Sequence, residues 1–174
     1  MIGGKIQNYR NILRRYIRDY GENENINRAV QVLEHAKREA LATQDKTTLI
    51  GYEGMASNAY FEVLPVLILN QKADFPFHGR NRRPPKDAVN AMLSFAYTLI
   101  ANDTSAALET VGLDPYVGFL HTLRPGRTSL ALDMMEELRA YLGDRFVLSL
   151  INKRQITSKD FLFQGDNGVV MTDK

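Results

Sequence analysis

The sequence contains no cysteine, so disulfide bonds and zinc sites built from thiolates are excluded. It also contains no apolar run that approaches the roughly 20 residues of a membrane-spanning helix. The first residues, MIGGKIQNYRNILRRY, lack the apolar core of a signal peptide. We therefore expect no membrane segment. The absence of cysteine by itself leaves the compartment open. Cytoplasmic residence is therefore only the default prediction.

Familiar catalytic motifs are absent as well. There is no phosphate-binding P-loop, no H-E-x-x-H zinc motif and no G-x-S-x-G nucleophile elbow, and a cysteine nucleophile is impossible. Any catalytic centre must therefore be assembled from residues that are scattered along the chain and meet only in the folded protein.

Positive charge is in slight excess, but the net charge of +2 at pH 7 is too small to indicate nucleic-acid binding by itself. The basic residues gather in three places: Arg10, Arg14, Arg15 and Arg18; Arg80, Arg82, Arg83 and Lys86; and Arg124 and Arg127. Each group taken alone is more simply a solvated surface. The three groups placed around one core would form a phosphate-binding surface.

Helical periodicity, in contrast, runs through most of the chain. With 174 residues, 44% of them hydrophobic, the chain is long enough for one core. Apolar spacings of three and four predict helices over residues 5–20, 26–41, 45–69, 89–99, 103–112, 114–121, 129–142 and 146–152. Gly21 is expected to end the first helix. Asn25 is the expected N-cap of the second helix, and Asp45 or Thr47 that of the third.

The C-terminal segment has a different pattern. Residues 161–172 (FLFQ-GDNG-VVMT) predict a β-hairpin around a Gly/Asp/Asn turn. We therefore predict an all-α fold, a single helical domain over residues 1–174, with a small C-terminal β-hairpin. Neither end of the sequence has a closing element, so we expect the domain to be truncated at both ends.

Glu53 lies within an apolar helical stripe. It shares one face with Ala56 and Tyr60, because these residues step by three or four. A buried carboxylate without a partner is expensive, so Glu53 should be protonated, paired with a cation or bound to a metal. The alternative, equally open from position alone, is that Glu53 sits at the edge of the stripe and reaches solvent. The flanking Gly51 and Gly54 indicate that something approaches this backbone closely.

More ionisable residues lie around the predicted helix 129–142. His121 ends the apolar segment YVGFLH, and the i, i+3 spacing of Asp133 and Glu136 puts both carboxylates on one helical face. Such carboxylates repel each other, and a bound cation would offset the repulsion. Periodicity alone would select Glu137 as the inward acid, so spacing does not separate it from Glu136. A hydrogen-bonded core histidine and an exposed acidic face are the simpler interpretation of these residues taken separately.

One histidine and two or three carboxylates make an oxygen-rich set with a single nitrogen. Such a set favours Mg²⁺ or Mn²⁺ over zinc, which prefers more nitrogen or sulfur ligands. With arginines nearby, the chemistry that fits best is displacement at a phosphodiester, where the cation polarises the phosphoryl oxygen.

Three long blocks of sequence carry a resemblance to a known family. They are GYEGMASNAYF at residues 51–61, FHGRNRRPPKDAVNAMLSFAYTL at residues 77–99 and GLDPYVGFLHTLRPGRTSLALDMMEELR at residues 112–139. In this order they resemble the CRISPR-associated spacer-acquisition integrases, the Cas1 family, and the sequence looks closest to subtype I-C. The similarity extends from about residues 4–8 (GKIQN) to the end of the chain.

The resemblance implies an all-α catalytic domain with one divalent-metal site for Mg²⁺ or Mn²⁺. It places the family's metal ligands on Glu53, His121 and Glu136, and the assisting acid on Asp133. It thereby selects Glu136 over Glu137. His121 could also assist proton transfer to the leaving oxygen, which is a common role of histidine in catalysis.

The resemblance also implies substrates and partners. Family members act on double-stranded DNA together with the Cas2 protein, and a 3′-hydroxyl of the prespacer attacks a phosphodiester at the CRISPR repeat boundary. Endonuclease activity on branched DNA is also attributed to them. Full-length members carry an N-terminal β-rich domain that contributes to dimerisation, so whether this chain forms a homodimer is left open. The residues expected to contact DNA phosphates are Arg80, Arg82, Arg83, Arg124 and Arg127.

Two other functions compete with this hypothesis. A non-catalytic helical DNA-binding or scaffold module would place its acids and histidine apart and bind no divalent metal. A metal hydrolase of small nucleotides would need an enclosed pocket sized for one nucleotide instead of an open basic groove.

Overall fold

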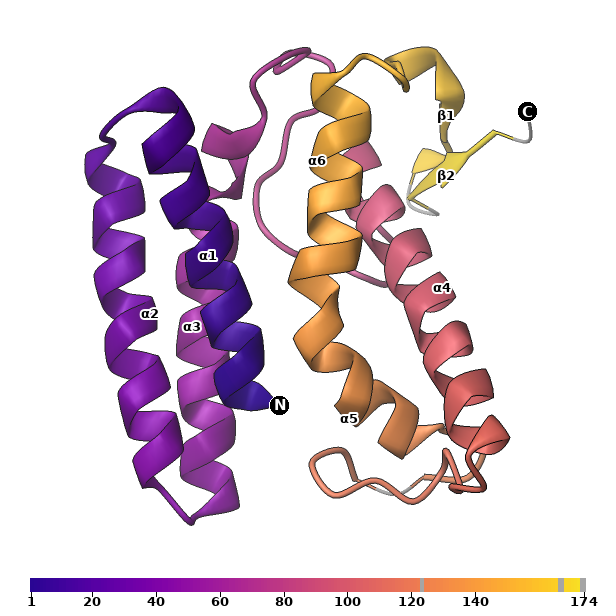
Figure 1. Ribbon diagram of the computed structural model, residues 1–174. Coiled ribbons are helices and arrows are strands. Elements are labelled where there is room, and N and C mark those ends of the chain that lie inside the picture. Colours follow the sequence, from indigo (N-terminus) through magenta and orange to yellow (C-terminus); the bar gives the residue numbers. More distant parts are fainter. Residues whose placement is uncertain (123, 166–167, 173–174) are drawn as a thin grey trace.

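The computed structural model describes residues 1–122, 124–165 and 168–172. In chain order its elements are α1 (Ile2–Tyr20), α2 (Glu24–Ala42), α3 (Lys46–Leu67), α4 (Ala88–Thr110), α5 (Ser129–Leu138), a π-helical segment (Arg139–Asp144), α6 (Arg145–Asn152), a 3₁₀ turn (Ser158–Asp160), β1 (Phe161–Phe163) and β2 (Val169–Met171). The predicted all-α fold with a small C-terminal β-hairpin is confirmed (Figure 1).

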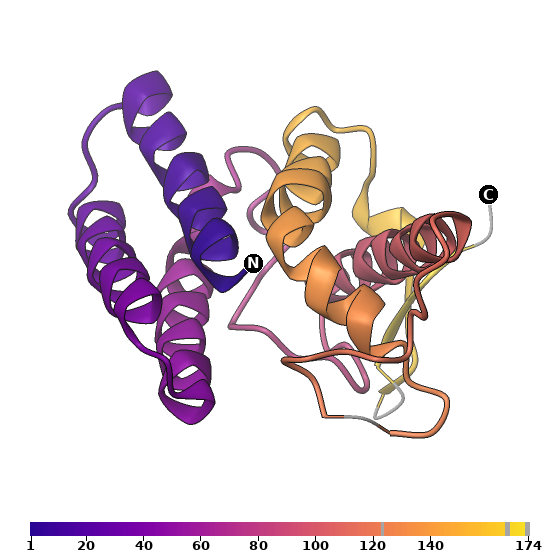
Figure 2. The same cartoon turned by 60° about the horizontal axis from the view of Figure 1, so that its bottom comes forward.

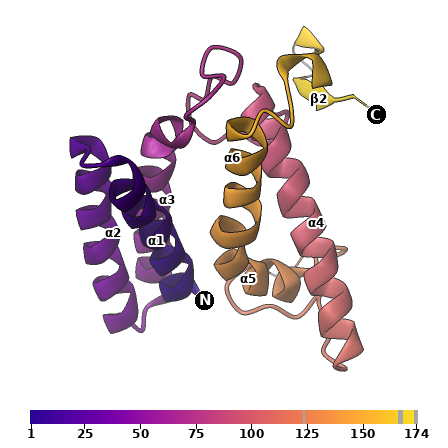
Figure 3. The same ribbon diagram turned by 45° about the horizontal axis from the view of Figure 1, so that its top comes forward.

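The helices form two groups that meet at α1. Helices α1, α2 and α3 pack against one another, and α4, α5 and α6 form the second group (Figures 1 and 3). Helix α1 also contacts α5 and the π-helical segment, so it joins the groups. Its apolar face enters the core through Ile6, Tyr9 and Leu13, and the Tyr9 ring stacks on Tyr60 of α3 with ring centroids 4.0 Å apart. Burial of this face holds the two groups together.

The helix ends follow local capping chemistry. Gly21 ends α1 with φ at 94°, as predicted. The N-cap of α2 is Asn23, whose side-chain oxygen accepts hydrogen bonds from the main-chain N–H groups of Asn25 and Ile26, both at 3.1 Å. The assignment of this cap to Asn25 was therefore wrong by two residues. Asp45 caps α3, accepting from the Thr48 N–H at 2.7 Å.

Helix α4 is longer than its periodicity suggested. It continues through Asp103, so the expected separate helix over 103–112 does not exist. Asp103 lies on the exposed side of the helix, where its capping propensity is not used. The chain leaves the helix before Gly112, whose φ of 79° suits glycine.

The expected helix over 114–121 is also wrong, because residues 113–121 form turns and irregular backbone. Long-range hydrogen bonds explain the difference. The main-chain N–H groups of Phe119, Leu120 and His121 all donate to Asp133 of α5. The Pro115 carbonyl accepts from the N–H groups at the start of α5. These contacts fix the segment as a wrapped loop (Figure 2).

The break expected between the helices 129–142 and 146–152 is replaced by a π-helical segment that joins α5 to α6 without interruption. Gly143 serves close packing, since a Cβ there would lie 2.9 Å from Cε1 of Tyr97. The next residue, Asp144, accepts a hydrogen bond from the Tyr97 hydroxyl at 2.5 Å. Tertiary packing thus overrides the local preference of this Gly-Asp pair.

The hairpin pairs β1 with β2 in antiparallel register, with Phe161 opposite Met171 and Phe163 opposite Val169. It docks on the body of the protein where the Val169 N–H donates to the Pro85 carbonyl at 2.8 Å. Asp166 and Asn167 of the predicted turn lie outside the described residues. In the part of the chain that the structure describes, no helix is long and apolar enough to span a membrane.

Candidate metal centre

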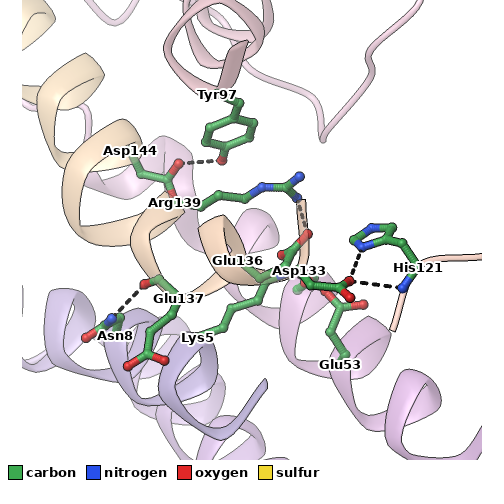
Figure 4. A network of polar contacts seen from close by, with 11 residues as sticks. Lys5, Asn8, Glu53, Tyr97, His121, Asp133, Glu136, Glu137, Arg139 and Asp144 are labelled. Carbon is green, nitrogen blue, oxygen red and sulfur yellow. Dashed lines mark hydrogen bonds and ion pairs between the residues drawn. The ribbon is translucent and has the colours of Figure 1, made fainter. Parts of the chain in front are cut away.

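Glu53 and Glu136 meet at the side-chain nitrogen of Lys5, where α3, α5 and α1 come together (Figure 4). Lys5 Nζ donates a hydrogen bond to Glu53 Oε1 and lies 2.6 Å from Glu136 Oε2. The two acids belong to helices far apart in the sequence, so tertiary packing creates the pair. The structure therefore brings two of the three predicted metal ligands around a cation, and that cation is an ammonium group.

Lys5 is buried, with only 3% of its side chain exposed. Burial by itself would lower the pKa of its ammonium group, but Tyr9, Glu136 and Glu53 together raise this pKa above its ordinary value. Lys5 is therefore protonated at neutral pH. Its charge offsets the repulsion between the two carboxylates.

Two further side chains complete the network. Arg139 pairs with Glu136 Oε1 at 2.9 Å, and the Ser57 hydroxyl donates to Glu53 Oε1 at 2.9 Å. Burial opposes ionisation of Glu53, but Lys5 and Ser57 outweigh it and lower the pKa of Glu53 below its ordinary value. Glu53 is therefore a carboxylate at neutral pH, which is the state that a metal requires.

The structure separates Glu136 from Glu137. The Glu136 side chain is 7% exposed and faces Lys5, whereas the Glu137 side chain is 49% exposed and its Oε2 lies 3.8 Å from the N-terminal amine. Periodicity favoured Glu137 because it shares a stripe with Met134 and Tyr141. Both of those residues are exposed, so that stripe does not face the core. The inward acid is Glu136.

His121 is paired with Asp133, which lies one helical turn before Glu136 on α5. The Asp133 side chain is fully buried, and its Oδ1 lies 2.5 Å from Nδ1 of His121. Its two oxygens also accept main-chain hydrogen bonds from Phe119, Leu120 and His121 at 2.7 to 2.9 Å. Burial would raise the pKa of Asp133, but these hydrogen bonds lower it below its ordinary value. Asp133 is therefore an ionised acceptor that orients the imidazole and leaves Nε2 for a ligand.

The loop that carries His121 lies unusually close to α5. A Cβ at Gly118 would lie 2.6 Å from the main-chain carbon of Ser129 and 2.8 Å from Oδ2 of Asp133. Only glycine permits this approach without displacement of the loop. Gly118 thereby controls the position of the imidazole relative to Asp133.

The donor set fits Mg²⁺ or Mn²⁺, although it is not arranged as a finished site. Within residues 1–122, 124–165 and 168–172, no three histidine or acidic side chains form a group that could hold a metal as they stand. The Lys5 ammonium lies between the carboxylates of Glu53 and Glu136. Oε2 of Glu136 is buried and, despite its short distance to Lys5, makes no hydrogen bond of good geometry. The donor set consists of two carboxylates, one of which carries this poorly satisfied oxygen, and one oriented imidazole. It matches the oxygen-rich chemistry of these ions.

The glycines beside Glu53 have a different role from the expected one. A Cβ added at Gly51 or Gly54 would meet nothing within 4 Å. The described chain therefore does not approach this backbone, and the expected close contact is absent from the fold itself.

Sequence reasoning missed Lys5 and Arg139. Lys5 had a detectable signal, since it lies between Ile2 and Tyr9 on the apolar face of the first helix, where a charged residue is unexpected. Arg139 had none, because it follows two acids on a helix and resembles an ordinary surface partner.

A polar cavity of about 210 Å³ opens beside the carboxylate pair. Lys5, Glu53 and Ser57 line one part of it, and Arg80 and Arg82 line another. The cavity is too small to enclose a whole nucleotide, so it gives no support to the alternative of a small-nucleotide hydrolase.

The predicted phosphate contacts divide into two kinds. Arg80 is held by α4, because its guanidinium donates to Asn90 Oδ1 at 2.7 Å and to Ser94 Oγ at 3.1 Å. Arg82, Arg83 and Arg124 are exposed and Arg127 is half-buried. Of these four residues, Arg82 lines the cavity beside Glu53.

The basic residues of α1 belong to surface ion pairs. Arg10 and Arg14 pair with Glu34, and Arg15 and Arg18 pair with Asp19. Such exposed pairs are typical of a solvated helix and contribute little stability. The simpler interpretation of this group therefore holds.

Sequence comparison identifies relatives along the whole chain. The profile of the family described as CRISPR associated protein Cas1 matches residues 1–174. The chain is 49% identical to a CRISPR-associated endonuclease Cas1 of Chlorobaculum tepidum over 173 residues, covering 98% of this chain and 50% of the relative. It is 48% identical to another of Rhodospirillum rubrum over 181 residues, covering 100% of this chain and 53% of the relative. The chain thus spans about half the length of the curated relatives it matches.

Solved structures agree with these matches. A Cas1 protein from Thermotoga maritima superposes with a TM-score of 0.80 at 28% identity, covering 99% of this chain and 52% of that protein. A casposase bound to its integration product gives 0.77 at 26% identity, with 98% and 49% covered. A chain of a partial Cas6-RT-Cas1–Cas2 complex gives 0.84 at 26% identity, with 98% and 52% covered.

Proposed function

Because the chain belongs to the CRISPR-associated Cas1 family, we propose that it carries the metal centre of a DNA endonuclease and integrase. The observation that supports the proposal is the convergence of Glu53 and Glu136 on one buried cation, with Asp133, one turn before Glu136 on α5, holding the His121 imidazole. Two carboxylates directed at one point repel each other, and a cation between them compensates this repulsion. We also propose that the chain belongs to subtype I-C and resides in the cytoplasm.

Glu53, Glu136 and Nε2 of His121 would hold Mg²⁺ or Mn²⁺. When bound, the ion would supply Lewis-acid activation of a phosphodiester oxygen. Asp133 holds His121 by its Nδ1 and keeps the ring in one orientation, as carboxylates commonly do for histidines that bind metals. Because Asp133 occupies Nδ1, the ring has a single nitrogen left. His121 therefore either ligates the ion or moves a proton, but does not do both at once.

The reaction we propose is transesterification. The 3′-hydroxyl oxygen of a prespacer bonds to a repeat-boundary phosphorus, the bond from phosphorus to the leaving 3′ oxygen breaks, and the proton lost by one hydroxyl is balanced by the proton gained by the other. Hydrolysis follows the same route with water as nucleophile. The similarity to a casposase bound to its integration product supports this class of chemistry.

Double-stranded DNA and Cas2 are the proposed partners. The matched complexes that contain Cas1 and Cas2 support the second of these. Arg82 places positive charge in the cavity beside Glu53, while Arg83, Arg124 and Arg127 would extend the contact to further phosphates. A homodimer remains the expectation for full-length relatives.

Binding of Mn²⁺, followed by calorimetry and by electron paramagnetic resonance, tests the proposal. Glu53→Ala and His121→Ala should each weaken binding by about 10-fold to 100-fold or more, since each removes one ligand. The same variants should lose strand transfer into a repeat-containing duplex when assayed with Cas2. If the folded protein binds no Mn²⁺ by either method, the result would favour the non-catalytic scaffold alternative.

A further inference from the structure

The Lys5 nitrogen stands where a shared divalent ion would stand. It contacts Glu53 Oε1 and lies 2.6 Å from Glu136 Oε2, so both carboxylates direct an oxygen at one point. Mg²⁺ binds carboxylate oxygens at about 2.0–2.1 Å. An ion that engages the same two oxygens therefore needs the space that the ammonium fills.

We propose that Lys5 is an internal competitor of the metal: its ammonium holds Glu53 and Glu136 together in the metal-free protein and must leave before a divalent ion can bind both. This inference rests on the proposed function, since it takes the two glutamates as the ligands. It assigns to Lys5 a positioning role, because the residue acts through the ligands and not on the DNA.

The charges explain why a lysine is suited to this position. Two carboxylates brought together without a cation would repel each other, and burial would increase the penalty. Lys5 compensates both of them, while Arg139 contacts only Glu136, through the other oxygen. Lys5 thus preserves the spacing of the ligands, and its positive charge at the same time lowers their affinity for a second cation.

The cavity beside the pair gives the ammonium a place to move. Lys5 is itself one of the residues that line this space of about 210 Å³, and its flexible side chain can rotate into it without unfolding α1. Ser57 and Asn58 also line this cavity, and the side chain of each carries an oxygen that can accept a hydrogen bond from the displaced group. No comparable space is needed for Arg139, which can stay on Glu136 Oε1.

Mn²⁺ titration of the full chain and of Lys5→Met tests the proposal. Methionine keeps an unbranched, flexible apolar stem but lacks the ammonium group at its end. We expect Lys5→Met to bind Mn²⁺ about tenfold more tightly or better, which corresponds to about 1.4 kcal/mol. We also expect a larger rise of the melting temperature on addition of Mn²⁺, because the metal-free variant loses the bridge between its carboxylates.

Arg139→Met is the matched control. It removes the same charge from the same network but does not free the point between the carboxylates, so its gain in affinity should be clearly smaller. An equal gain in both variants would overturn the proposal, because net charge alone would then explain the effect. Unchanged or weaker binding by Lys5→Met would overturn it as well, and would make Lys5 a purely structural bridge.

The outcomes also separate this inference from the proposed function. If the parent protein binds Mn²⁺ tightly and Lys5→Met binds it with the same affinity, Lys5 is not a competitor, but the metal centre is supported. Binding that is seen in Lys5→Met and is absent from the parent supports both. If neither protein binds Mn²⁺, the inference on Lys5 and the proposed metal centre are both refuted. If Lys5→Met does not fold, judged by circular dichroism, Lys5→Gln is measured under the same criteria, because its amide can bridge the carboxylates without a charge.

Discussion

Nδ1 of His121 lies 2.5 Å from Oδ1 of Asp133, and the same carboxylate accepts three main-chain hydrogen bonds from the loop that carries the histidine. Asp133 therefore fixes both the imidazole and its backbone. An acid with this many protein donors has little capacity left for a metal. Its role is to place His121, while Glu53 and Glu136 are the acids available as ligands.

Asp133→Asn should disturb both functions of this carboxylate. The amide cannot accept all of these hydrogen bonds, and its NH₂ group would face N–H donors in a buried site. We expect a loss of about 1–3 kcal/mol in the free energy of unfolding. Mn²⁺ affinity should fall about 10-fold to 100-fold, as is typical when the residue that orients a ligand is changed. Urea denaturation and Mn²⁺ titration measure the two effects. Unchanged Mn²⁺ binding in a destabilised variant would show that the orientation of His121 is not needed for the metal.

Glu136→Gln and Glu137→Gln form a second, sharply matched pair. The residues are neighbours, and the substitutions are chemically identical, but Glu136 contacts Lys5 and Arg139 while Glu137 is about half exposed. We expect Glu136→Gln to lose Mn²⁺ binding and strand transfer, whereas Glu137→Gln retains both within about twofold. Equal loss in the two variants would contradict the assignment of Glu136 as the inward ligand.

Much of the fold could be predicted because its signals are local. Helix α1, the Asp45 cap of α3 and the C-terminal hairpin each follow from apolar spacing or turn chemistry within a few residues. The segment 113–121 could not be predicted in this way. Its main-chain groups bond to Asp133 and to the start of α5, and those partners are known only once the chain has folded.

The residues of the candidate site also depend on contacts that the local sequence does not reveal. The apolar stripe left open whether Glu53 is buried or reaches solvent, and its side chain is 25% exposed, whereas Ala56 and Tyr60 of the same stripe are fully buried. The choice between Glu136 and Glu137 could not be predicted either, because the helical stripe that suggested Glu137 is exposed in the folded protein. Lys5 was overlooked because a lysine near the start of a helix is ordinarily solvated, and its burial depends on two acids from other helices.

Gly118→Ala tests whether the loop must lie against α5. The added methyl group would overlap the main chain of Ser129 and Oδ2 of Asp133, so the loop should move and carry His121 with it. We expect a loss of about 1–3 kcal/mol in stability and weaker Mn²⁺ binding. Gly51→Ala is the control, since its methyl group meets nothing within 4 Å and should raise helix stability by about 0.5–1 kcal/mol. Native-like Mn²⁺ affinity in Gly118→Ala would refute the proposed dependence.

The arginines should differ in what they contribute to DNA binding. Neutralising the exposed Arg82 and Arg83 together should weaken binding of duplex DNA and reduce the slope of log Kd against log salt by about 2, since two phosphates would no longer be neutralised by the protein. Arg80→Ala should mainly lower stability, because Arg80 is hydrogen-bonded to Asn90 and Ser94 of α4. Fluorescence anisotropy at several salt concentrations measures the slope. A slope unchanged in the double variant would exclude these two residues from the DNA-binding surface.

Asp144 gives the protein a pH dependence that can be isolated. The side chain is fully buried between the two helix groups, with its Oδ1 accepting from Tyr97. Burial raises the pKa of Asp144 to about 6 from an ordinary value of 3.8, although Tyr97 and Tyr60 act in the opposite direction. The folded protein therefore binds this proton more tightly than the unfolded chain. Its contribution to stability is fully present below about pH 4 and is lost as the pH rises through about 6.

The expected loss across this window is about 3 kcal/mol, since each unit of pKa difference corresponds to about 1.4 kcal/mol. Asp144→Asn keeps an acceptor for Tyr97 but cannot ionise, so the difference in unfolding free energy between variant and parent should shift in favour of the variant between pH 4 and pH 7. Taking this difference removes the titration of the three histidines, which both proteins share. Asp133 does not affect this comparison. Its pKa is lowered in the folded protein, so its contribution to stability is present above its pKa in the unfolded chain, 3.8, and is lost only as the pH falls below that value. Parallel curves for the two proteins between pH 4 and pH 7 would mean that Asp144 is ionised in the folded protein throughout, with Arg139 and Lys5 compensating its charge.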